Sequence, residues 1–385
     1  MKGLLKYLIM LFLRLFVRIF YIFPIKSNRL LFFSYKGTQY SDSPMYVSKE
    51  LVKQFGTRLQ IIWAFKNKKD YKFLTQEGIK LVKYYSIKRV YYECTSKICI
   101  NNIGSYSWLP LRKGQEHINT WHGGGAYKRC ALGEVKNNKY VKKTFNYGAK
   151  ETSCFLSSCK IFSDKVLKDD FNYSGFTLNI GLPRNDCFFD QKHIDNISDK
   201  LRKIYNLENK SVILYAPTWR YEETGETIDP ERILSVFNKK YDRQFVFLYR
   251  GHHLSKTNLN FDFVENRIID VTDYSNMQDL LCLADFLITD YSSCIWDFAL
   301  MHKPIYLYVP DLSSYISNRG FHVTVTEYGF PYAEDNSELC KLILDDSLEN
   351  AYINAEQHLK MLGSYESGFA TEKTVNFIKN KLTID

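Results

Sequence analysis

The stretch NTWHGGGAYKRC, residues 119–130, places His122 directly before three consecutive glycines. Each glycine costs about 1 kcal/mol relative to alanine in regular structure, so the run indicates that bare backbone is needed there. An imidazole titrates near neutral pH and can accept a proton from a hydroxyl group. We therefore predict that His122 is a general base and that Gly123, Gly124 and Gly125 let a ligand approach the backbone. The alternative is a structural histidine in a strand-end loop.

Three further polar clusters each follow an apolar run that is typical of a buried strand. Thr218 and Arg220 follow SVILYA, Arg250 and His252 follow QFVFLY, and Asp290, Ser292 and Ser293 follow DFLIT. Arginine and histidine can donate to phosphate oxygens, and the first turn of a helix that opens with serine attracts anions. Because ligands bind beyond the carboxyl ends of parallel strands, we predict that these clusters and His122 bind a phosphorylated ligand.

Several rival interpretations are open at this point. Arg220 could be an ordinary surface arginine, and Ser292 and Ser293 could do no more than cap the helix SCIWDFALMHK. HGGG also occurs in lipase-like hydrolases, but their G-x-S-x-G elbow is absent, and so is a phosphate-binding G-x-x-x-x-G-K-[ST] loop. The nine cysteines contain no CxxC pair, so we predict no metal site and expect free, mostly buried thiols.

Apolar runs that alternate with amphipathic stretches divide into two sets. The predicted strands are 29–35, 59–65, 97–102 and 116–121, then 211–216, 244–250, 266–272, 285–290 and 304–311. Strands that are apolar throughout and alternate with helices predict parallel sheets covered on both faces. We expect an α/β protein of two Rossmann-like domains that face a cleft, with domains at 26–195 and 196–385 and a linker near 181–200. An alternative division keeps these domains but lets the last helix of the chain pack back on the N-terminal domain.

The basic charge of the chain lies in its N-terminal third. Residues 1–37 carry a net charge of +7 and residues 51–113 a further +10. In residues 1–25, Lys2, Lys6, Arg14 and Arg18 fall on one side of a helix whose other side is apolar. Two arginines within that helix argue against a membrane span, so we predict a helix that lies in an anionic membrane surface. A helix docked on its own protein is the alternative. Nucleic-acid binding is not expected, because no known binding module is present.

These motifs together resemble the CDP-glycerol:poly(glycerophosphate) glycerophosphotransferase family, the teichoic-acid glycerol- and ribitol-phosphate transferases. The resemblance covers about residues 29–375. It rests on Trp121-His122-Gly123, the GLPRND segment that contains Arg184 and Asn185, Tyr215–Arg220, Arg250-Gly251-His252, and the long segment 279–311 with Asp290, Ser292, Ser293 and Asp297. The family often has W-H-G-T-P-L-K, whereas this chain continues with Gly124, Gly125, Ala126, Tyr127 and Lys128.

The resemblance implies a GT-B-like fold, a CDP-alditol donor bound mainly by the C-terminal domain, and a membrane-bound acceptor linked to a prenyl diphosphate such as undecaprenyl diphosphate. It implies that the two important histidines of the family correspond to His122 and His252. It places the enzyme at the cytoplasmic face of the plasma membrane, in teichoic acid or capsular polymer synthesis. The expected protein partners are a second copy of the same chain or other enzymes of wall-polymer assembly, and the oligomeric state is left open. No tightly bound cofactor is expected, and metal dependence is left open.

The predicted reaction is transfer of glycerol phosphate from CDP-glycerol to an acceptor hydroxyl, with release of CMP. His122 is the expected base, and Arg250, His252, Ser292 and Ser293 are expected to neutralise the diphosphate. Three alternatives remain open: CDP-ribitol as the donor, a GT-B glycosyltransferase that uses a sugar nucleotide, and a membrane-associated scaffold without catalytic activity.

Overall fold

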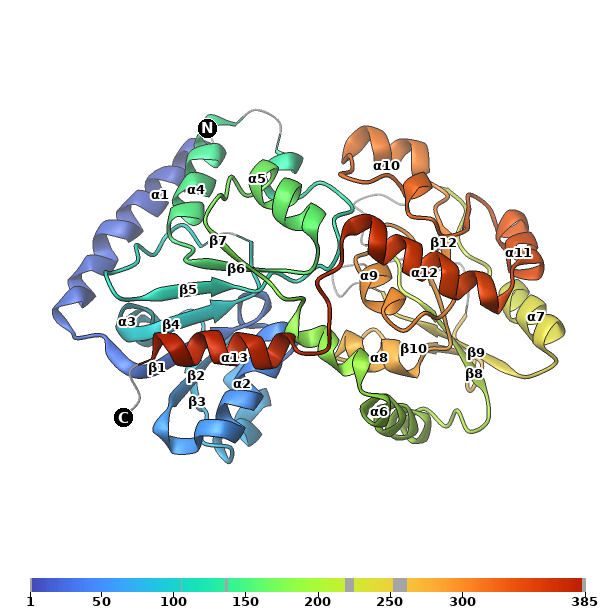
Figure 1. The fold of residues 1–385 in the computed structure, drawn as a ribbon, viewed down its shortest axis with the longest axis horizontal. Helices are drawn as coiled ribbons and strands as arrows, with labels where there is room; N and C mark the ends of the chain where they lie inside the picture. Colours follow the sequence, from blue (N-terminus) through green and yellow to red (C-terminus); the bar gives the residue numbers. More distant parts are fainter. Residues whose placement is uncertain (1, 105, 136–137, 219–224, 252–261, 383–385) are drawn as a thin grey trace. The chain divides into compact units, whose positions relative to one another are not determined.

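The computed structural model describes residues 2–104, 106–135, 138–218, 225–251 and 262–382, and Figure 1 shows its elements. The chain divides into two compact units. Unit 1 consists of residues 1–122, 130–186 and 365–385, and unit 2 consists of residues 123–129 and 187–364. The chain thus passes between the units at four places. The sequence predicted a boundary after residue 195 and, as a variant, a last helix that packs back on the N-terminal domain.

Unit 1 is built on a parallel sheet of seven strands in the order β3-β2-β1-β4-β5-β6-β7. The strands are β1 (Lys26–Phe33), β2 (Gln60–Phe65), β3 (Lys80–Lys83), β4 (Ser96–Asn101), β5 (Glu116–Asn119), β6 (Cys154–Ser157) and β7 (Phe176–Asn179). The α-helices are α1 (Lys2–Phe16), α2 (Asp42–Phe55), α3 (Ile87–Thr95), α4 (Lys139–Lys150), α5 (Leu167–Asp169) and α13 (Ala370–Lys381). Asn101 pairs with Asn119, so β4 and β5 end at the same edge of the sheet.

Unit 2 contains a parallel sheet of six strands in the order β10-β9-β8-β11-β12-β13. The strands are β8 (Ser211–Tyr215), β9 (Phe245–Tyr249), β10 (Ile268–Asp270), β11 (Phe286–Thr289), β12 (Ile305–Tyr308) and β13 (Tyr332–Ala333). The α-helices are α6 (Gln191–Ile204), α7 (Pro230–Tyr241), α8 (Met277–Leu283), α9 (Cys294–Ala299), α10 (Leu312–Asn318), α11 (Asn336–Asp345) and α12 (Leu348–Leu362). Tyr215 pairs with both Tyr249 and Ile288, so the three central strands end together.

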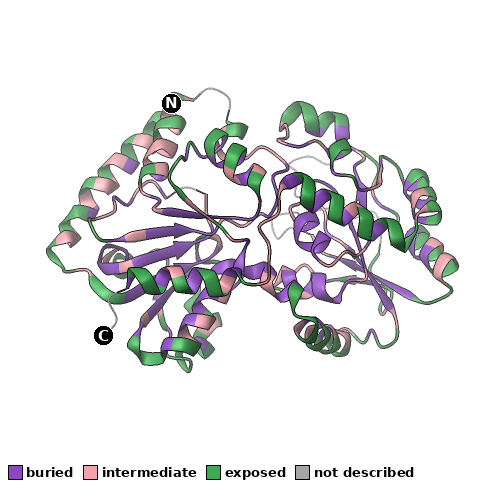
Figure 2. Ribbon diagram, viewed as in Figure 1, coloured by how far each residue is buried: buried purple, intermediate pink, exposed green. Residues whose placement is uncertain are grey.

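Short helical turns join these elements. They are η1 (Val17–Ile22), η2 (Tyr35–Gly37), η3 (Gly56–Arg58), η4 (Lys68–Thr75), η5 (Ala131–Glu134), η6 (Phe162–Val166), η7 (Pro183–Phe189) and η8 (Val325–Glu327). Most of the strands are buried along most of their length, as Figure 2 shows, because helices cover both faces of each sheet; β3, β7 and β10 at the sheet edges are partly exposed. This burial explains why most of the strands read as continuous apolar runs.

Helix α13 returns the chain to unit 1, where it packs on α2. Val375 and Ile378 are fully buried in the same apolar cluster as Trp63 of β2. The carboxylate of Asp186 accepts hydrogen bonds from the backbone N–H groups of Ala370 and Thr371, at 2.9 and 2.6 Å. A carboxylate at this position satisfies donors that the first turn of a helix cannot pair internally.

All nine predicted strands are present, within a few residues of their expected bounds. Strands β3, β6, β7 and β13 were missed. Strands β3 and β7 are partly exposed and lack a buried apolar run, β6 has four residues beside a helical pattern, and β13 has only two residues. The sequence pattern of residues 69–85 favours a crossover helix, but the segment is η4 followed by β3; Gly78, with φ of +79°, lies between them. The chain passes from unit 1 to unit 2 between Asp186 and Cys187, within the predicted linker 181–200, although η7 and the start of α6 occupy this segment. The cysteines are free, and all but Cys130 are buried.

The N-terminal helix α1 docks on α4 and leaves an apolar face exposed. Arg14 lies on the docked face, where it forms an ion pair with Glu151, donates to the carbonyl of Ser107 at 2.6 Å and stacks on Tyr147. The expectation that Arg14 faces lipid headgroups is therefore wrong, because a carboxylate of the same unit neutralises it. Among the described residues, no helix has both the length and the hydropathy that a membrane crossing requires.

Candidate active site

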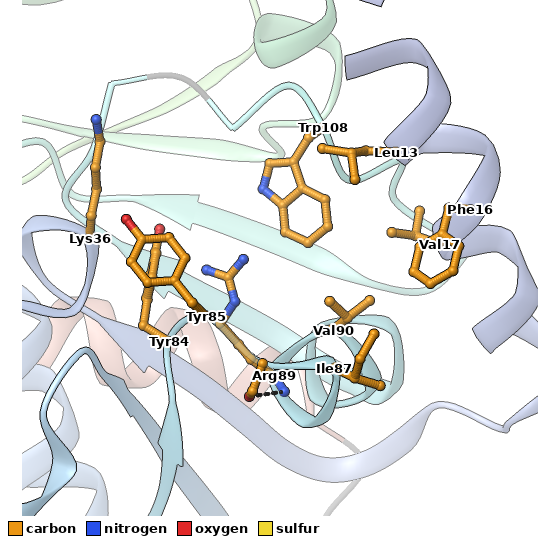
Figure 3. Close-up of a pocket in the computed structure, with 11 residues that line it drawn as sticks. Leu13, Phe16, Val17, Lys36, Tyr84, Tyr85, Ile87, Arg89, Val90 and Trp108 are labelled. Atoms are coloured by element: carbon orange, nitrogen blue, oxygen red, sulfur yellow. Dashed lines mark hydrogen bonds between the residues drawn. The ribbon is translucent and has the colours of Figure 1, made fainter. Parts of the chain in front are cut away.

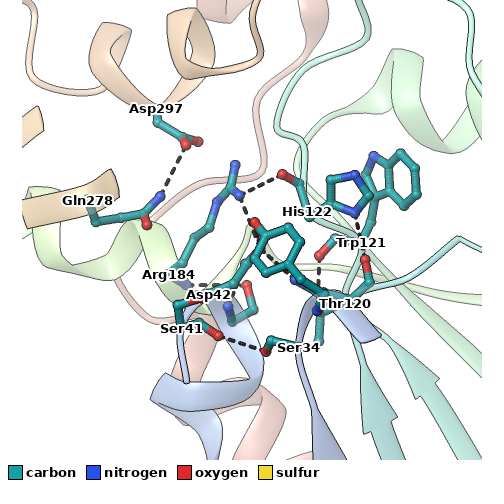
Figure 4. A network of polar contacts seen from close by, with 12 residues as sticks. Ser34, Ser41, Asp42, Thr120, Trp121, His122, Arg184, Gln278 and Asp297 are labelled. Carbon is teal, nitrogen blue, oxygen red and sulfur yellow. Dashed lines mark hydrogen bonds and ion pairs between the residues drawn. The ribbon is translucent and has the colours of Figure 1, made fainter. Parts of the chain in front are cut away.

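His122 lies just beyond the end of β5, in the position predicted for it. Its Nδ1 is 2.6 Å from the carbonyl oxygen of Asn102, which follows β4 (Figure 4). A carbonyl oxygen can only accept, so Nδ1 carries the proton and Nε2 is the basic nitrogen of the ring. The rings of Trp121 and Tyr35 flank the imidazole, with centroids at 4.0 and 5.6 Å. This tautomer suits a base that acts through Nε2.

A buried ion pair supports the backbone around His122. Arg184 donates to the carbonyl of His122 at 2.7 Å and pairs with Asp42 at 3.4 Å (Figure 4). Asp42 also accepts from the hydroxyl of Tyr35 at 2.7 Å and from the side-chain amide of Asn102 at 2.9 Å. The contacts close a ring, because Asn102 in turn accepts from His122 through its carbonyl.

Asp42 is a charged residue with only 2% of its surface exposed. Burial raises its pKa, but the guanidinium of Arg184 and the hydrogen bonds from Ser43, Tyr35 and Asn102 outweigh burial, so the pKa is lowered overall. Asp42 is therefore ionised at neutral pH. Removing either member of such a pair leaves an uncompensated buried charge, which typically costs about 3–5 kcal/mol.

Strained backbone gathers around the same ring. Tyr35, Asp42 and Trp121 have φ values of +46°, +62° and +53°, although none of them is glycine. Such conformations cost about 1–3 kcal/mol each and persist only where surrounding contacts impose them. The strain is therefore further evidence, from geometry, that this part of unit 1 is a functional site.

The glycines after His122 belong to unit 2, and Gly124 and Gly125 are packed tightly there. A Cβ on Gly124 would lie 2.0 Å from Cδ1 of Trp296, and Gly125 has φ of +67° beneath the ring of Tyr127. The close approach that these glycines permit is made by the protein's own aromatic rings. Ligand contact by Gly123, Gly124 and Gly125 stays a prediction.

Tyr127 and His358 hold this glycine loop. The hydroxyl of Tyr127 is 2.7 Å from Nε2 of His358, whose Nδ1 is 2.7 Å from the carbonyl of Tyr328. The carbonyl fixes the proton on Nδ1, so the tyrosine donates to Nε2. Burial lowers the pKa of His358 to about 4, so the ring is neutral near neutral pH.

In unit 2 the structure brings together three of the predicted clusters at the ends of β8, β9 and β11. Both carboxylate oxygens of the buried Asp290 accept the backbone N–H of Thr218, at 2.9 Å. The backbone N–H of Arg250 donates to Tyr215, and the guanidinium of Arg250 donates to the carbonyl of Tyr274 at 2.6 Å. Asp290 thus positions the turn after β8.

The serine cluster differs from its prediction in one respect. Helix α9 has six residues and ends at Ala299, and the hydroxyl of Ser293 makes no capping hydrogen bond. Ser292 accepts the N–H of Cys294 instead, at 3.4 Å. Asp297 is buried and accepts from Gln278 at 3.2 Å, as Figure 4 shows.

Asn185, another residue predicted to bind substrate, lies in unit 1. It is fully buried, and its side-chain amide donates to Glu366 at 3.0 Å.

Arg220 and His252 lie outside the described residues, so their predicted roles stay predictions. Within the described residues, no group of three or more His, Cys, Asp or Glu side chains is arranged to hold a metal ion.

A family model described as CDP-Glycerol:Poly(glycerophosphate) glycerophosphotransferase matches residues 15–380. The chain belongs to this glycerophosphotransferase family. It is accordingly a transferase, and its similarity to proteins of teichoic acid biosynthesis is extensive. The match includes each predicted cluster and most of both units.

Relatives in the family agree with this assignment. The chain is 27% identical over 317 residues to the teichoic acid poly(glycerol phosphate) polymerase of Bacillus spizizenii W23, and covers 80% of it. It is 29% identical over 365 residues to the teichoic acid glycerol-phosphate transferase of Staphylococcus aureus, and covers 92% of that protein. It spans less than half, 43%, of the longer polymerase of Staphylococcus epidermidis.

Solved structures of a family member have the same fold. A histidine-to-asparagine variant of the wall teichoic acid polymerase TagF, soaked with CDPG, superposes with a TM-score of 0.80 at 26% identity. The superposition covers 93% of this chain and 90% of that one. A UDP complex of MnaA from S. aureus, at 16% identity and a TM-score of 0.52, shares the fold alone.

Asp42, Asn102 and Tyr35 were missed as site residues by the sequence analysis. Asn102 is the last residue of the predicted strand 97–102, which was a usable signal, because the side chains at the ends of parallel strands gather at one edge. Asp42 precedes residues 43–56, whose amphipathic pattern favours a helix, and was indistinguishable from an ordinary helix-start residue.

We expect Gly124→Ala to destabilise the protein, because the new methyl group overlaps Trp296. Overpacking of this kind costs about 1–3 kcal/mol and displaces the loop. Chemical denaturation should show the loss, and adding Trp296→Leu should recover part of it. Independent, additive effects of the two substitutions would contradict the assignment of Trp296 as the obstacle.

We expect acid to destabilise the protein partly through His358. Its pKa is about 4 when folded and 6.5 when unfolded, so the unfolded state binds the extra proton between these values. The stabilisation is complete above pH 6.5 and is lost as the pH falls toward 4, by up to about 3 kcal/mol. His358→Gln should flatten this part of the stability profile, measured by denaturation between pH 4 and 7. A variant that keeps the full slope would contradict the contribution of His358.

Proposed function

We propose that this enzyme transfers glycerol phosphate from CDP-glycerol to a hydroxyl group of a lipid-linked acceptor. The acceptor oxygen forms a bond to the glycerol-linked phosphorus, and the bond between that phosphorus and the bridging oxygen breaks. The electron pair leaves with CMP, and Nε2 of His122 takes the hydroxyl proton. The family membership and the names of the relatives support the reaction, and the hydrogen bond from His122 to Asn102 is the observation that supports the base.

The donor's phosphates are assigned to groups of unit 2. Arg250 supplies positive charge for the diphosphate. Thr218, Ser292 and Ser293, at the ends of β8 and β11, supply neutral hydrogen-bond donors. We keep His252 and Arg220 in this set on the strength of their motifs. Phosphoryl transfer depends mainly on positioning and on charge stabilisation, so a set of fixed donors and one base is sufficient machinery.

CDP-ribitol is a second candidate donor. The chain is 24% identical over 379 residues to the teichoic acid ribitol-phosphate primase of B. spizizenii W23, and covers 93% of it. Glycerol-phosphate enzymes stand first among the relatives, so CDP-glycerol is the donor we propose. The assay below therefore offers both donors.

We expect purified enzyme to convert CDP-glycerol, with a lipid-linked disaccharide acceptor, to CMP and an acceptor that is heavier by glycerol phosphate. His122→Asn should lower turnover by about 10²–10⁴-fold, because the amide can still donate to Asn102 but cannot accept a proton. Binding of CDP-glycerol, measured by calorimetry, should persist. Product mass identifies the donor when CDP-ribitol is offered in parallel.

His302→Asn is the matched control, since His302 lies on the surface of unit 2 beside Glu356. It should keep full activity. If His122→Asn loses donor binding in step with turnover, or keeps its turnover, His122 is not the base.

We propose further that the enzyme binds the cytoplasmic face of an anionic membrane through α1 and η1. Leu5, Leu8, Phe12, Leu15 and Ile19 form one exposed apolar face, and Phe12 has 67% of its surface exposed. Lys6 and Arg18 are exposed as well. An apolar strip with cations beside it suits the interface of an anionic bilayer.

We expect Leu8→Ser/Phe12→Ser to abolish most sedimentation with phosphatidylglycerol vesicles. Each side chain contributes about 1.5–3 kcal/mol on burial, so the loss should exceed about tenfold in affinity. Leu344→Ser/Leu348→Ser, at exposed leucines of unit 2, is the control and should bind normally. Equal vesicle binding by the two double variants would show that α1 does not contact the membrane.

A further inference from the structure

Unit 1 contains a cavity that the proposed reaction does not use. Its volume is about 500 Å³, within the range of small-molecule sites, ~300–1,000 Å³. Residues of α1, η1, η2, the start of α3 and the loop after β4 line it, as Figure 3 shows. Leu13, Phe16, Val17, Ile87 and Val90 make most of its wall apolar.

The guanidinium of Arg89 is the main polar group of this cavity. It lies over the rings of Tyr84 and Trp108, with Cζ at 4.0 and 5.2 Å from their centroids (Figure 3). Arg89 has only 8% of its surface exposed, yet its Nε and Nη1 have no hydrogen-bond partner among the described residues. A buried guanidinium with unpaired donors is costly, and a ligand that accepts hydrogen bonds removes this cost.

Glu93 is the nearest carboxylate to Arg89 and does not satisfy it. Its Oε1 lies 3.6 Å from Nη1, beyond hydrogen-bond distance, and neither of its carboxylate oxygens has a partner. Glu93 is fully buried and is not part of the cavity wall. Burial raises the pKa of Glu93 to about 7, against the opposing effect of Arg89, so near neutral pH Glu93 cancels only part of the arginine's charge.

We propose that this cavity binds a hydrocarbon chain that carries a phosphate group. The phosphate pairs with Arg89 and with Lys36, the other cation of the cavity, and Tyr85 supplies a hydroxyl group. The hydrocarbon chain of the ligand lies among Leu13, Phe16, Val17 and Val90. Arginine binds phosphate through two parallel hydrogen bonds, and the apolar wall excludes a free, fully hydrated anion.

Two membrane components have this chemistry: a polyprenyl phosphate and an anionic phospholipid. Both would reach the cavity from α1, because Leu13 and Phe16 of the cavity belong to this helix, which also carries the exposed apolar face. The proposal concerns lipid binding alone, so it does not depend on which alditol phosphate is transferred or on His122.

The test measures binding of dodecyl phosphate, below its micelle concentration, to the purified full chain by calorimetry. Glu93→Gln breaks the same ion pair as an arginine substitution but keeps the guanidinium, so it should bind as the parent does or more tightly. Arg89→Gln/Glu93→Gln, which leaves no buried charge, should bind at least about tenfold more weakly. Thermal melts confirm that both variants are folded.

Four further ligands and one further variant complete the test. Dodecyl maltoside and inorganic phosphate should bind weakly, since each lacks half of the recognised chemistry. Val90→Phe should reduce dodecyl phosphate binding by filling the apolar end. Tighter binding of geranylgeranyl phosphate than of short-chain phosphatidylglycerol supports the site and identifies a polyprenyl source, and the reverse order identifies a bilayer lipid. Equal affinity of the parent and the Arg89→Gln/Glu93→Gln variant, or equal binding of dodecyl maltoside, would overturn the proposal.

Discussion

The buried carboxylate of Asp42 is the constraint on which the geometry of unit 1 depends at its functional edge. It holds Arg184, Asn102 and Tyr35, and two of these hold His122. A carboxylate can be ionised at such depth only when several donors converge on it. The convergence forces Tyr35 and Asp42 itself into left-handed conformations, so the strain and the charge pair belong to one arrangement. Catalytic geometry and local stability are therefore set by the same few contacts.

The same logic separates what the sequence could predict from what it could not. The ends of β5, β8, β9 and β11 were predictable, because continuous apolar runs identify parallel strands and ligands bind past their carboxyl ends. His122, Thr218, Arg250 and Asp290 occupy those ends as expected. Family motifs extended the prediction to Arg184 and Asn185, which no periodicity could have indicated.

Partners far apart in the sequence were not predictable. Nothing local indicates that Arg184 pairs with Asp42, 142 residues away, or that Trp296 packs on Gly124. The glycine run shows the difficulty well, since bare backbone beside a histidine has the same sequence signature whether a ligand or an indole ring occupies the space. Short strands such as β13 were also missed, because two residues carry no detectable alternation.

Helix α13 has a consequence for how the protein is made. The ribosome synthesises most of unit 1 before unit 2, yet the core of unit 1 is complete only when Val375 and Ile378 have been added. Asp186 likewise gains its hydrogen bonds only when Ala370 and Thr371 have been synthesised. Residues 187–364, by contrast, form almost all of unit 2 in one uninterrupted stretch. The later unit can therefore mature during translation while the earlier one stays open. Vectorial synthesis thus reverses the order of folding, and the nascent first half needs protection from aggregation until its final helix emerges.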